Sequence, residues 1–207
     1  MNVLELYAGS RSVGKVAERR GHRVWSSDLI DFGGINYVTD ILDFDVRNVP
    51  FVPDMIWASP PCTAFSVAAI GRNWDKDTRL PKTDGARLGI QLLEKTLEII
   101  ARYPTAIFFM ENPRGMMRKM PHVLGLTRHT VSYCRYGDSR MKPTDIWTNS
   151  KLWTPRDMCK NGDPCHEAAP RGARTGTQGI KGAYARSQIP EALCEEVIAI
   201  CEIEHAY

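Results

Sequence analysis

The chain has 207 residues, of which 43% are hydrophobic, so it is long enough for one well-buried core and crowded for two. No run of about 18 apolar residues occurs, and the opening MNVLELYAG lacks the basic and then apolar pattern of a secretion signal, so we expect a cytoplasmic protein with no membrane partner. Six cysteines in such a chain are expected to be reduced thiols rather than a disulfide framework.

The first half of the chain alternates short apolar stretches with helix-like stretches, which is the pattern of parallel βαβ units. Strands are predicted over residues 2–8, 22–28, 37–44, 54–60 and 106–112, and helices over residues 12–21 and 86–103. The polar stretch 70–86 is punctuated by glycine and proline and is too long for a simple turn; loops of this kind are usually functional or disordered. The sequence therefore predicts an α/β fold.

The second half of the chain is less regular. A strand pair is predicted over residues 129–137 and 144–150, and a final helix over residues 189–205, with Pro190 in its first turn. Between them, residues 154–182 are rich in glycine, proline and charge. No internal repeat appears, so we expect one domain, with residues 150–180 as the segment most suited to an insertion or to recognition.

The net charge of +3 is unevenly distributed. Residues 1–111 carry 13 basic against 14 acidic side chains, residues 112–186 carry 14 against 5, and residues 187–207 carry none against 5. The middle segment, with 14 − 5 = +9, favours a polyphosphate partner such as a nucleic acid. A basic surface that is merely solvated has the same composition, so charge alone leaves both interpretations open.

Small residues follow the first predicted strand in LYAGS, residues 6–10, where a ligand can approach the backbone closely. Asp28 ends the second predicted strand, and an acid at this position can accept hydrogen bonds from ribose hydroxyls. The stretch is not GxGxxG and no phosphate-loop lysine follows, which disfavours a dinucleotide or a nucleoside triphosphate and leaves an adenosine moiety open. Asp40, after the third predicted strand, is expected either to contact the base or to cap a turn.

The stretch SPPCTAFS, residues 59–66, places Cys62 directly after the fourth predicted strand, at the same edge of the sheet. Pro60 and Pro61 stiffen the backbone and fix the direction of the next side chain, which suits a nucleophile. Most isolated free cysteines are instead small buried hydrophobes. The prolines and the neighbouring edge residues favour the nucleophile here.

Glu111 ends the apolar run AIFFMEN. Desolvation at the end of such a strand raises the pKa of a carboxyl group and allows it to donate a proton near neutral pH. A strand-end glutamate that simply meets solvent is the ordinary alternative.

Taken in order, these motifs resemble the DNA cytosine-5 methyltransferase family. The matching segments are LELYAG, Asp28, SPPCTAFS, ENPRG, a basic strand pair with Arg140, and QIPEAL, spread over residues 3–198. The resemblance implies a Rossmann-like, S-adenosylmethionine-dependent methyltransferase fold, with one catalytic domain over residues 1–207. Residues 150–180 would form a short irregular insertion in place of the family's long target-recognition region. A region of this length implies short or degenerate recognition sites, or a protein partner that supplies specificity.

The resemblance also implies the site residues. Catalysis would rest on Cys62 as the nucleophile, Glu111 on the target base and Arg140 as a cation. The residues implied to bind S-adenosyl-L-methionine are Tyr7, Ala8, Gly9, Ser10, Asp28, Asp40 and Pro60, with Asp28 on the ribose and Asp40 near the adenine. The segment IPEAL would return to close the cofactor pocket.

In the implied reaction, the Cys62 thiolate adds to carbon 6 of a cytosine flipped out of duplex DNA, and carbon 5 then takes the methyl group. Glu111 and Arg140 would stabilise the charge that develops on the base. The basic loop 70–87 would close over the site as a lid. The same chemistry on RNA or on a free cytosine nucleotide, and a binding role without turnover, remain alternatives at this stage.

Two motifs depart from the family pattern. Pro113 follows Glu-Asn where valine is usual, and Arg186-Ser187 stands where Gly-Asn is common.

Three potential zinc ligands, Cys159, Cys165 and His166, lie within eight residues of the expected insertion. The usual close cysteine spacing is absent and no fourth ligand is evident, although Cys134 or His129 could be brought near. The sequence therefore predicts no metal site, with this cluster as the open alternative.

Overall fold

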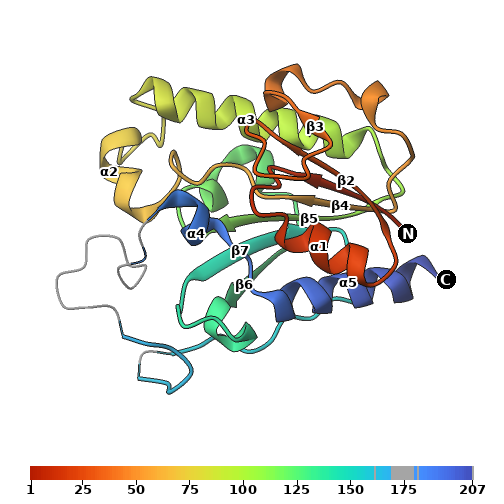
Figure 1. Cartoon of the computed structure of the whole chain (residues 1–207). Coiled ribbons are helices and arrows are strands. Elements are labelled where there is room, and N and C mark those ends of the chain that lie inside the picture. Colours follow the sequence, from red (N-terminus) through yellow and green to blue (C-terminus); the bar gives the residue numbers. More distant parts are fainter. Residues whose placement is uncertain (161, 169–179, 181, 207) are drawn as a thin grey trace.

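One mixed sheet of seven strands runs through the computed structural model, which describes residues 1–160, 162–168, 180 and 182–206 (Figure 1). The strands are β1 (Asn2–Leu6), β2 (Arg23–Asp28), β3 (Tyr37–Val38), β4 (Met55–Ala58), β5 (Ile107–Pro113), β6 (Arg128–Ser132) and β7 (Pro143–Thr148). Their order in the sheet is β3-β2-β1-β4-β5-β7-β6. The first five pair in parallel, and β7 lies antiparallel between β5 and β6.

The alternation of side chains along the central strands divides the core into two layers. Leu4 and Ile56 lie in the cluster that includes Leu93 of α3 (Asp84–Ala101). Val3 and Met55, one position away, lie in the cluster shared by α1 (Ser12–Arg19) and α5 (Glu191–His205). Because successive side chains of a strand point to opposite faces, each strand serves both layers.

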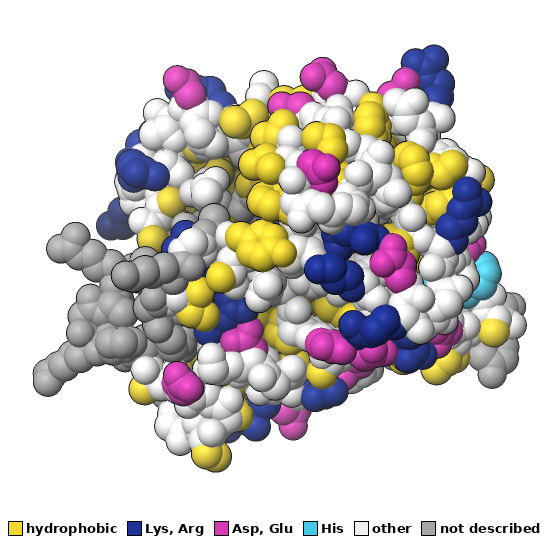
Figure 2. All heavy atoms as spheres, in the orientation of Figure 1, with side chains coloured by type: hydrophobic (Ala, Val, Ile, Leu, Met, Phe, Trp, Pro, Cys, Tyr) yellow, Lys and Arg dark blue, Asp and Glu magenta, His cyan; other side chains and the backbone are white. Residues whose placement is uncertain are grey.

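Helices α1 and α5 pack side by side on one face of the sheet, and α3 covers the other (Figure 1). Ion pairs join α1 and the turn after it to α5, and the basic and acidic side chains interleave over these helices (Figure 2). The pairs are Arg19–Glu191, Arg20–Glu195 and Arg20–Glu202. Such exposed pairs fix the relative position of the helices more than they add stability.

The remaining helical elements are short. Two are α-helical, α2 (Ile70–Asn73) and α4 (Ala183–Ser187). The 3-10 turns are η1 (Ile41–Asp43), η2 (Val46–Asn48), η3 (Val67–Ala69), η4 (Met117–Lys119), η5 (Pro121–Val123) and η6 (Tyr133–Tyr136). In the part of the chain that the structure describes, no helix has the length and apolar character needed to span a bilayer.

The carboxyl ends of β1, β2, β4 and β5 align at one edge of the sheet. Leu6 pairs with Ser27 of β2 and with Ala58 of β4, which in turn pairs with Met110. The residues that follow these four positions therefore lie along a single line across the sheet. Open α/β sheets bind their ligands at this edge.

Most predicted elements are confirmed, with three differences. The third strand, predicted over 37–44, ends at Val38, because Asp40 accepts a hydrogen bond from the Leu42 N–H and starts the turn η1. The polar stretch 70–86 holds α2 and the start of α3. The strand predicted over 129–137 ends at Ser132 and continues as η6, which Gly137 closes with φ of 87°. Residues 161, 169–179 and 181 of the expected insertion and linker lie outside the described residues.

Candidate active site

The turn after β1 is held against the end of β2. The Gly9 N–H donates to Asp28 Oδ2 at 2.8 Å, and the Ala8 N–H donates to the Ser27 carbonyl at 3.0 Å. Tyr7 and Gly9 have φ of 55° and 50°, so the chain turns sharply at both positions. Asp28 Oδ1 also accepts from the Ile30 N–H. Each carboxylate oxygen can accept two hydrogen bonds, so Asp28 is fixed and retains acceptors for a ligand.

Glu5 lies beneath this turn, and the sequence prediction did not include it. Its carboxylate is 2% exposed and accepts hydrogen bonds from the Val13 and Gly14 N–H groups and from Ser26 Oγ. A Cβ at Gly14 would lie 2.5 Å from Glu5 Oε2, so only glycine allows this approach. Burial raises the pKa of Glu5 to about 7. An acid inside the apolar strand NVLEL was the signal available in the sequence.

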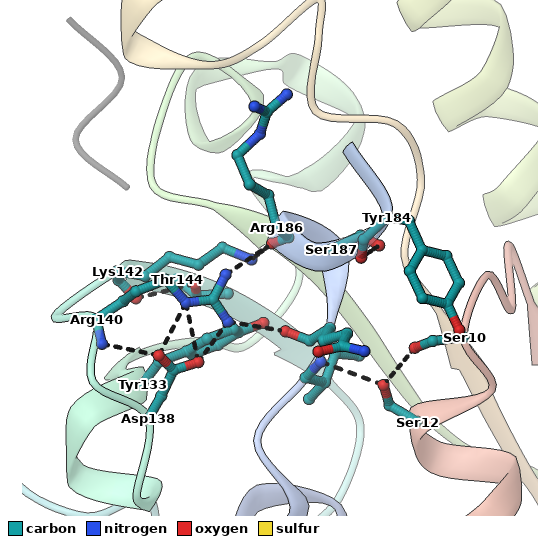
Figure 3. A network of polar contacts seen from close by, with 12 residues as sticks. Ser10, Ser12, Tyr133, Asp138, Arg140, Lys142, Thr144, Tyr184, Arg186 and Ser187 are labelled. Atoms are coloured by element: carbon teal, nitrogen blue, oxygen red, sulfur yellow. Dashed lines mark hydrogen bonds and ion pairs between the residues drawn. The ribbon is translucent and has the colours of Figure 1, made fainter. Parts of the chain in front are cut away.

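The C-terminal segment returns to the same turn. Ser10 Oγ hydrogen-bonds Ser12 Oγ at 2.8 Å, and Ser12 Oγ accepts from the Ile189 N–H (Figure 3). Ser187 Oγ lies 3.9 Å from the position that a Cβ on Gly9 would occupy. Residues 187–189 therefore lie against the turn after β1, and closure of a cofactor pocket by this segment stays a prediction.

Two other predicted cofactor residues have local partners. Asp40 caps η1, as described above. Burial, and to a smaller extent the charge of Asp40, raise the pKa of Tyr7, so the two side chains are near each other. The Pro60 carbonyl accepts a hydrogen bond from Asn112 Nδ2 at 2.8 Å. The capping role that the sequence left open for Asp40 is thus present, and its contact with a base stays a prediction.

The loop that carries Cys62 is fixed at both ends. Ser59 accepts a hydrogen bond from Trp57 Nε1, and the Cys62 carbonyl accepts from the N–H groups of Phe65 and Ser66. Gly115 packs against this loop so closely that a Cβ there would lie 2.2 Å from the Phe65 carbonyl oxygen. The Cys62 side chain itself is half-buried. These contacts orient the thiol before any substrate is present.

Among the charged groups, Glu111 and Lys142 have the largest effects on the pKa of the Cys62 thiol. Burial, and then the negative charge of Glu111, raise the pKa of Cys62, whereas the positive charges of Lys142 and Arg186 lower it. Burial lowers the pKa of Lys142, and the charges of Glu111 and Cys62 oppose that shift. The three side chains therefore interact electrostatically as one group. Cys62 comes from the loop after β4, Glu111 from β5, and Lys142 from the position directly before β7.

Tyr133 contacts both Glu111 and Lys142. Its buried hydroxyl donates to Glu111 Oε1 at 2.9 Å. The Lys142 ammonium lies 4.4 Å from the centre of the Tyr133 ring, and Figure 3 shows both side chains. Lys142 Nζ also donates to the Arg186 carbonyl at 3.2 Å. Neither Tyr133 nor Lys142 was among the predicted site residues. The signals in the sequence were a tyrosine within the stretch HTVSYCRYG and a lysine directly before the proline that begins β7.

Arg140, the cation that the sequence predicts to be catalytic, has several partners within the chain. Its guanidinium is 3% exposed, ion-paired with Asp138, and donates to the carbonyls of Arg186 at 3.0 Å and Gln188 at 3.3 Å (Figure 3). These partners occupy it within the chain, so Arg140 anchors the C-terminal segment. The charge of Glu111 acts on both Lys142 and Arg140, and Lys142 also acts on Cys62, so the catalytic role of Arg140 stays a prediction.

The predicted lid is partly fixed. Trp74 is 2% exposed, stacks on Phe65 and donates from Nε1 to the Ala64 carbonyl at 2.7 Å. Asn73 donates to the same carbonyl. Asn73 and Trp74 therefore support the Cys62 loop, and residues 84–87 belong to α3. The turn between them, residues 75–82, is tied back by hydrogen bonds from the Lys82 N–H to the Asn73 carbonyl and from the Asp75 N–H to the Leu80 carbonyl. Closure of this turn over the site stays a prediction.

A parallel α/β sheet with one reversed strand near its edge, a tight glycine turn beside an acidic strand end, and a cysteine loop beside a buried glutamate define a methyltransferase of the Rossmann-like class. The profile of the C-5 cytosine-specific DNA methylase family matches residues 32–125. A protein of frog virus 3 (isolate Goorha), named as a probable DNA (cytosine-5)-methyltransferase, is 31% identical over 220 residues, which cover 97% of this chain and 100% of that protein. The chain therefore belongs to the C-5 cytosine-specific DNA methylase family.

Solved structures support the fold. An E. coli prophage protein described as a DNA modification methyltransferase matches 99% of this chain and 69% of its own, with a TM-score of 0.51 and 16% identity. The S. pombe Dnmt2 methyltransferase matches 75% of this chain and 53% of its own, with a TM-score of 0.51 and 14% identity. The predicted family, methyltransferase fold and enzyme class are confirmed, and family membership assigns the chain to DNA cytosine methylation in general.

Proposed function

We propose that this chain transfers a methyl group to carbon 5 of cytosine in DNA through a covalent adduct between Cys62 and carbon 6, within a single catalytic domain over residues 1–207. The observation that carries the proposal is the grouping of Cys62, Glu111 and Lys142 at the carboxyl edge of the sheet. A purely binding protein has no use for a half-buried thiol held beside a buried carboxylate.

The residues along the turn after β1 fit an adenosine-containing cofactor. Asp28 is fixed by two backbone N–H groups and keeps acceptors for ribose hydroxyls, while Ala8 and Gly9 leave the backbone accessible beside it. Tyr7, Ser10, Asp40 and Pro60 lie in or next to the same edge and complete the proposed site. S-adenosylmethionine, when bound there, supplies a methyl group on a positively charged sulfur.

The protein's own residues perform the remaining chemistry. The Cys62 thiolate forms a bond to carbon 6, and the electrons of the ring double bond make carbon 5 nucleophilic. Glu111 contacts ring nitrogen N3, and the Lys142 ammonium offsets the charge that develops on the base. After carbon 5 has gained the methyl group, its proton passes to solvent, the double bond re-forms and Cys62 leaves as a thiolate.

The cytosine has to leave the helix for this chemistry, because carbon 5 and carbon 6 cannot be reached inside the base stack. The basic side chains of segment 112–186 would contact the phosphates, and the turn 75–82 would close over the flipped base. Arg140 donates to the carbonyls of Arg186 and Gln188 and, in this proposal, also supplies positive charge near Glu111 and the bound base.

A transfer assay with a labelled methyl donor tests the proposal on duplex DNA, RNA and free cytosine nucleotide in parallel. Wild-type protein is expected to label DNA and to leave the other two at background, and Cys62→Ser is expected to lose transfer on DNA. Labelling of RNA or nucleotide in preference to DNA, or transfer by Cys62→Ser, would contradict it. Binding of DNA without transfer by a correctly folded wild-type protein would favour the non-catalytic alternative.

Sequence choice is proposed to be minimal, because only residues 150–180 stand in place of a target-recognition region. Bisulfite sequencing of DNA treated with the protein alone is expected to show methylation at short or degenerate sites. Methylation that appears only after a cell extract is added would instead assign recognition to a protein partner.

A further inference from the structure

Four side chains outside the proposed active site converge at the start of the expected insertion. They are Cys134 of η6, Cys159, Cys165 and His166, and their ligand atoms all lie within 4.8 Å of one another. Cys134 and Cys159 are buried, whereas Cys165 and His166 are half-buried. The cluster thus joins two segments that are about 25 residues apart in the sequence.

The distances within the cluster fit a metal better than a disulfide. Cys165 Sγ lies 3.5 Å from Cys134 Sγ and 3.3 Å from Cys159 Sγ, and His166 Nδ1 lies 3.3 Å from Cys159 Sγ and 4.0 Å from Cys165 Sγ. A tetrahedral zinc ion with ordinary bond lengths separates two thiolates by about 3.8 Å and a thiolate from an imidazole nitrogen by about 3.5 Å. A disulfide needs about 2.05 Å. The sulfur and nitrogen atoms are therefore spaced as corners of a coordination tetrahedron.

The chain builds this arrangement with contacts that do not need the metal. The Asp163 N–H donates to the Lys160 carbonyl, and Gly162 has φ of 91°, so a tight turn brings the two ends of the segment together. Asp163 Oδ2 accepts from the Lys160 N–H at 2.9 Å and from Arg135 at 2.7 Å. The Cys159 N–H donates to Ser132 Oγ, directly before η6.

The composition of the cluster indicates a structural rather than a catalytic metal. Three sulfurs and one nitrogen fill the four positions of a tetrahedral ion and leave none for water or substrate. His129, the other fourth ligand that the sequence left open, lies outside the cluster, with its ring 5.3 Å from that of Trp153. The sequence predicted no metal because a fourth ligand was not evident, and Cys134 supplies it in the structure.

We propose that Cys134, Cys159, Cys165 and His166 bind one zinc ion, which fastens the insertion to η6. Binding forms three zinc–sulfur bonds and one zinc–nitrogen bond, and the thiol protons pass to solvent without any oxidation or reduction. Arg135, next to Cys134 and paired with Asp163, places a positive charge beside the thiolates. Because Tyr133 precedes Cys134 and donates to Glu111, the metal also holds the element that supports the proposed active site. The assignment of the metal does not depend on the proposed methyl transfer.

Elemental analysis of protein purified under reducing conditions without chelator tests the assignment. We expect about one zinc per chain in the wild type and less than about 0.1 in Cys159→Ser and Cys165→Ser. Cys62→Ser serves as the matched control and is expected to retain its zinc, because Cys62 lies outside the cluster. A wild type without zinc, stoichiometric iron in its place, or full zinc in the two cluster variants would overturn the proposal.

Two further measurements exclude misfolding of the variants as the cause of metal loss. Cobalt(II) added to zinc-stripped wild-type protein is expected to give the absorption of a tetrahedral site with thiolate ligands, without any substitution. His166→Cys offers four thiolates and is expected to keep the zinc, whereas His166→Ala is expected to bind it more weakly. Absence of the cobalt spectrum, or a mass spectrum showing a disulfide among these cysteines in protein kept under reductant, would contradict the site.

Discussion

The Cys62 thiol lies between opposing charges. Burial and Glu111 keep its pKa above the ordinary value of 9.0, and Lys142 and Arg186 act in the other direction. In the free protein the thiol is therefore mostly protonated at neutral pH, which protects it from oxidation and alkylation. In the proposed mechanism, the thiol becomes reactive when the bound substrate changes the charges around it.

Glu111→Gln is predicted to have opposite effects on two reactions of the same protein. Glutamine keeps the acceptor for the Tyr133 hydroxyl and removes the negative charge, so the pKa of Cys62 falls and its alkylation at pH 8 becomes roughly 2–10-fold faster. Methyl transfer is expected to fall by about 100-fold or more, because the carboxyl group that contacts ring nitrogen N3 of the base is lost. Peptide mapping after iodoacetamide treatment measures the first effect and a transfer assay the second. Slower alkylation of Cys62 would show that Glu111 does not act on the thiol through its charge.

Substitution of Lys142 is predicted to affect mainly kcat, and substitution of Arg140 mainly the stability of the fold. Lys142→Met is expected to reduce kcat by about 100-fold with a small change in melting temperature, and Lys142→Arg to restore most of the activity. Arg140→Met leaves Asp138 without its cation and frees two carbonyls, so it is expected to destabilise the fold by about 3 kcal/mol. Steady-state kinetics and thermal unfolding measure the two variants side by side. A Lys142→Met protein with wild-type kcat would remove Lys142 from the proposed mechanism.

The loop that carries Cys62 is held in place by the end of β5 and by the segment that follows it. The Cys62 loop packs on Gly115 from the segment after β5, and Asn112 of β5 donates to the Pro60 carbonyl. Backbone contact at this distance requires glycine, because any side chain would displace the loop that carries the nucleophile.

Gly115→Ala is therefore predicted to cost about 2 kcal/mol of unfolding free energy and to reduce activity beyond that loss, since the new Cβ forces the Phe65 carbonyl away. Gly125→Ala is the matched control, because nothing lies within 4 Å of a Cβ there, and its stability is expected to change by less than about 0.5 kcal/mol. Chemical denaturation measures both. Equal effects of the two substitutions would mean that the close packing of the Cys62 loop is not needed.

The start of α1 rests on Glu5, which introduces a pH dependence. Because burial raises the pKa of Glu5 from 4.5 to about 7, folding favours its protonated form. Its contribution to stability is complete below pH 4.5 and is lost as the pH rises through 7, by roughly 3 kcal/mol in all. Glu5→Gln stays neutral, so its stability relative to the wild type is predicted to rise between pH 5 and pH 8. A difference that does not change with pH, measured by denaturation at both values, would contradict this.

For the whole molecule, the order of strands along the sheet explains what the sequence could predict. Buried parallel strands are continuous apolar runs, so β1, β4 and β5 were recognised, and the residues directly after them were placed correctly at one edge. The cofactor turn, Asp28, the Cys62 loop and Glu111 follow from that edge alone. None of these inferences needed knowledge of how the second half of the chain folds.

Apart from Glu5, the missed residues come from the second half, where chain order and spatial order differ. The reversed strand β7 lies between β5 and β6, and this strand order brings Lys142 and Tyr133 close to Glu111. Arg140 is instead hydrogen-bonded to the C-terminal segment. The meeting of Cys134 with Cys165 depends on the same reversal. The pair of β6 and β7 has a local signal in the sequence, but the pairing of β7 with β5 has none, because it joins segments about 30 residues apart and its register is set by side-chain packing across the sheet.

The central claim is that Cys62 attacks carbon 6 of a cytosine in DNA. Wild-type protein, incubated with methyl donor and duplex DNA that carries 5-fluorocytosine, is predicted to form a covalent complex, because fluorine cannot leave as a proton does and the adduct persists. Denaturing electrophoresis should show the complex, and mass spectrometry should place the bond on Cys62, with no complex from Cys62→Ser. An active preparation that methylates ordinary DNA and forms no such complex, or forms it through another residue, would contradict the account.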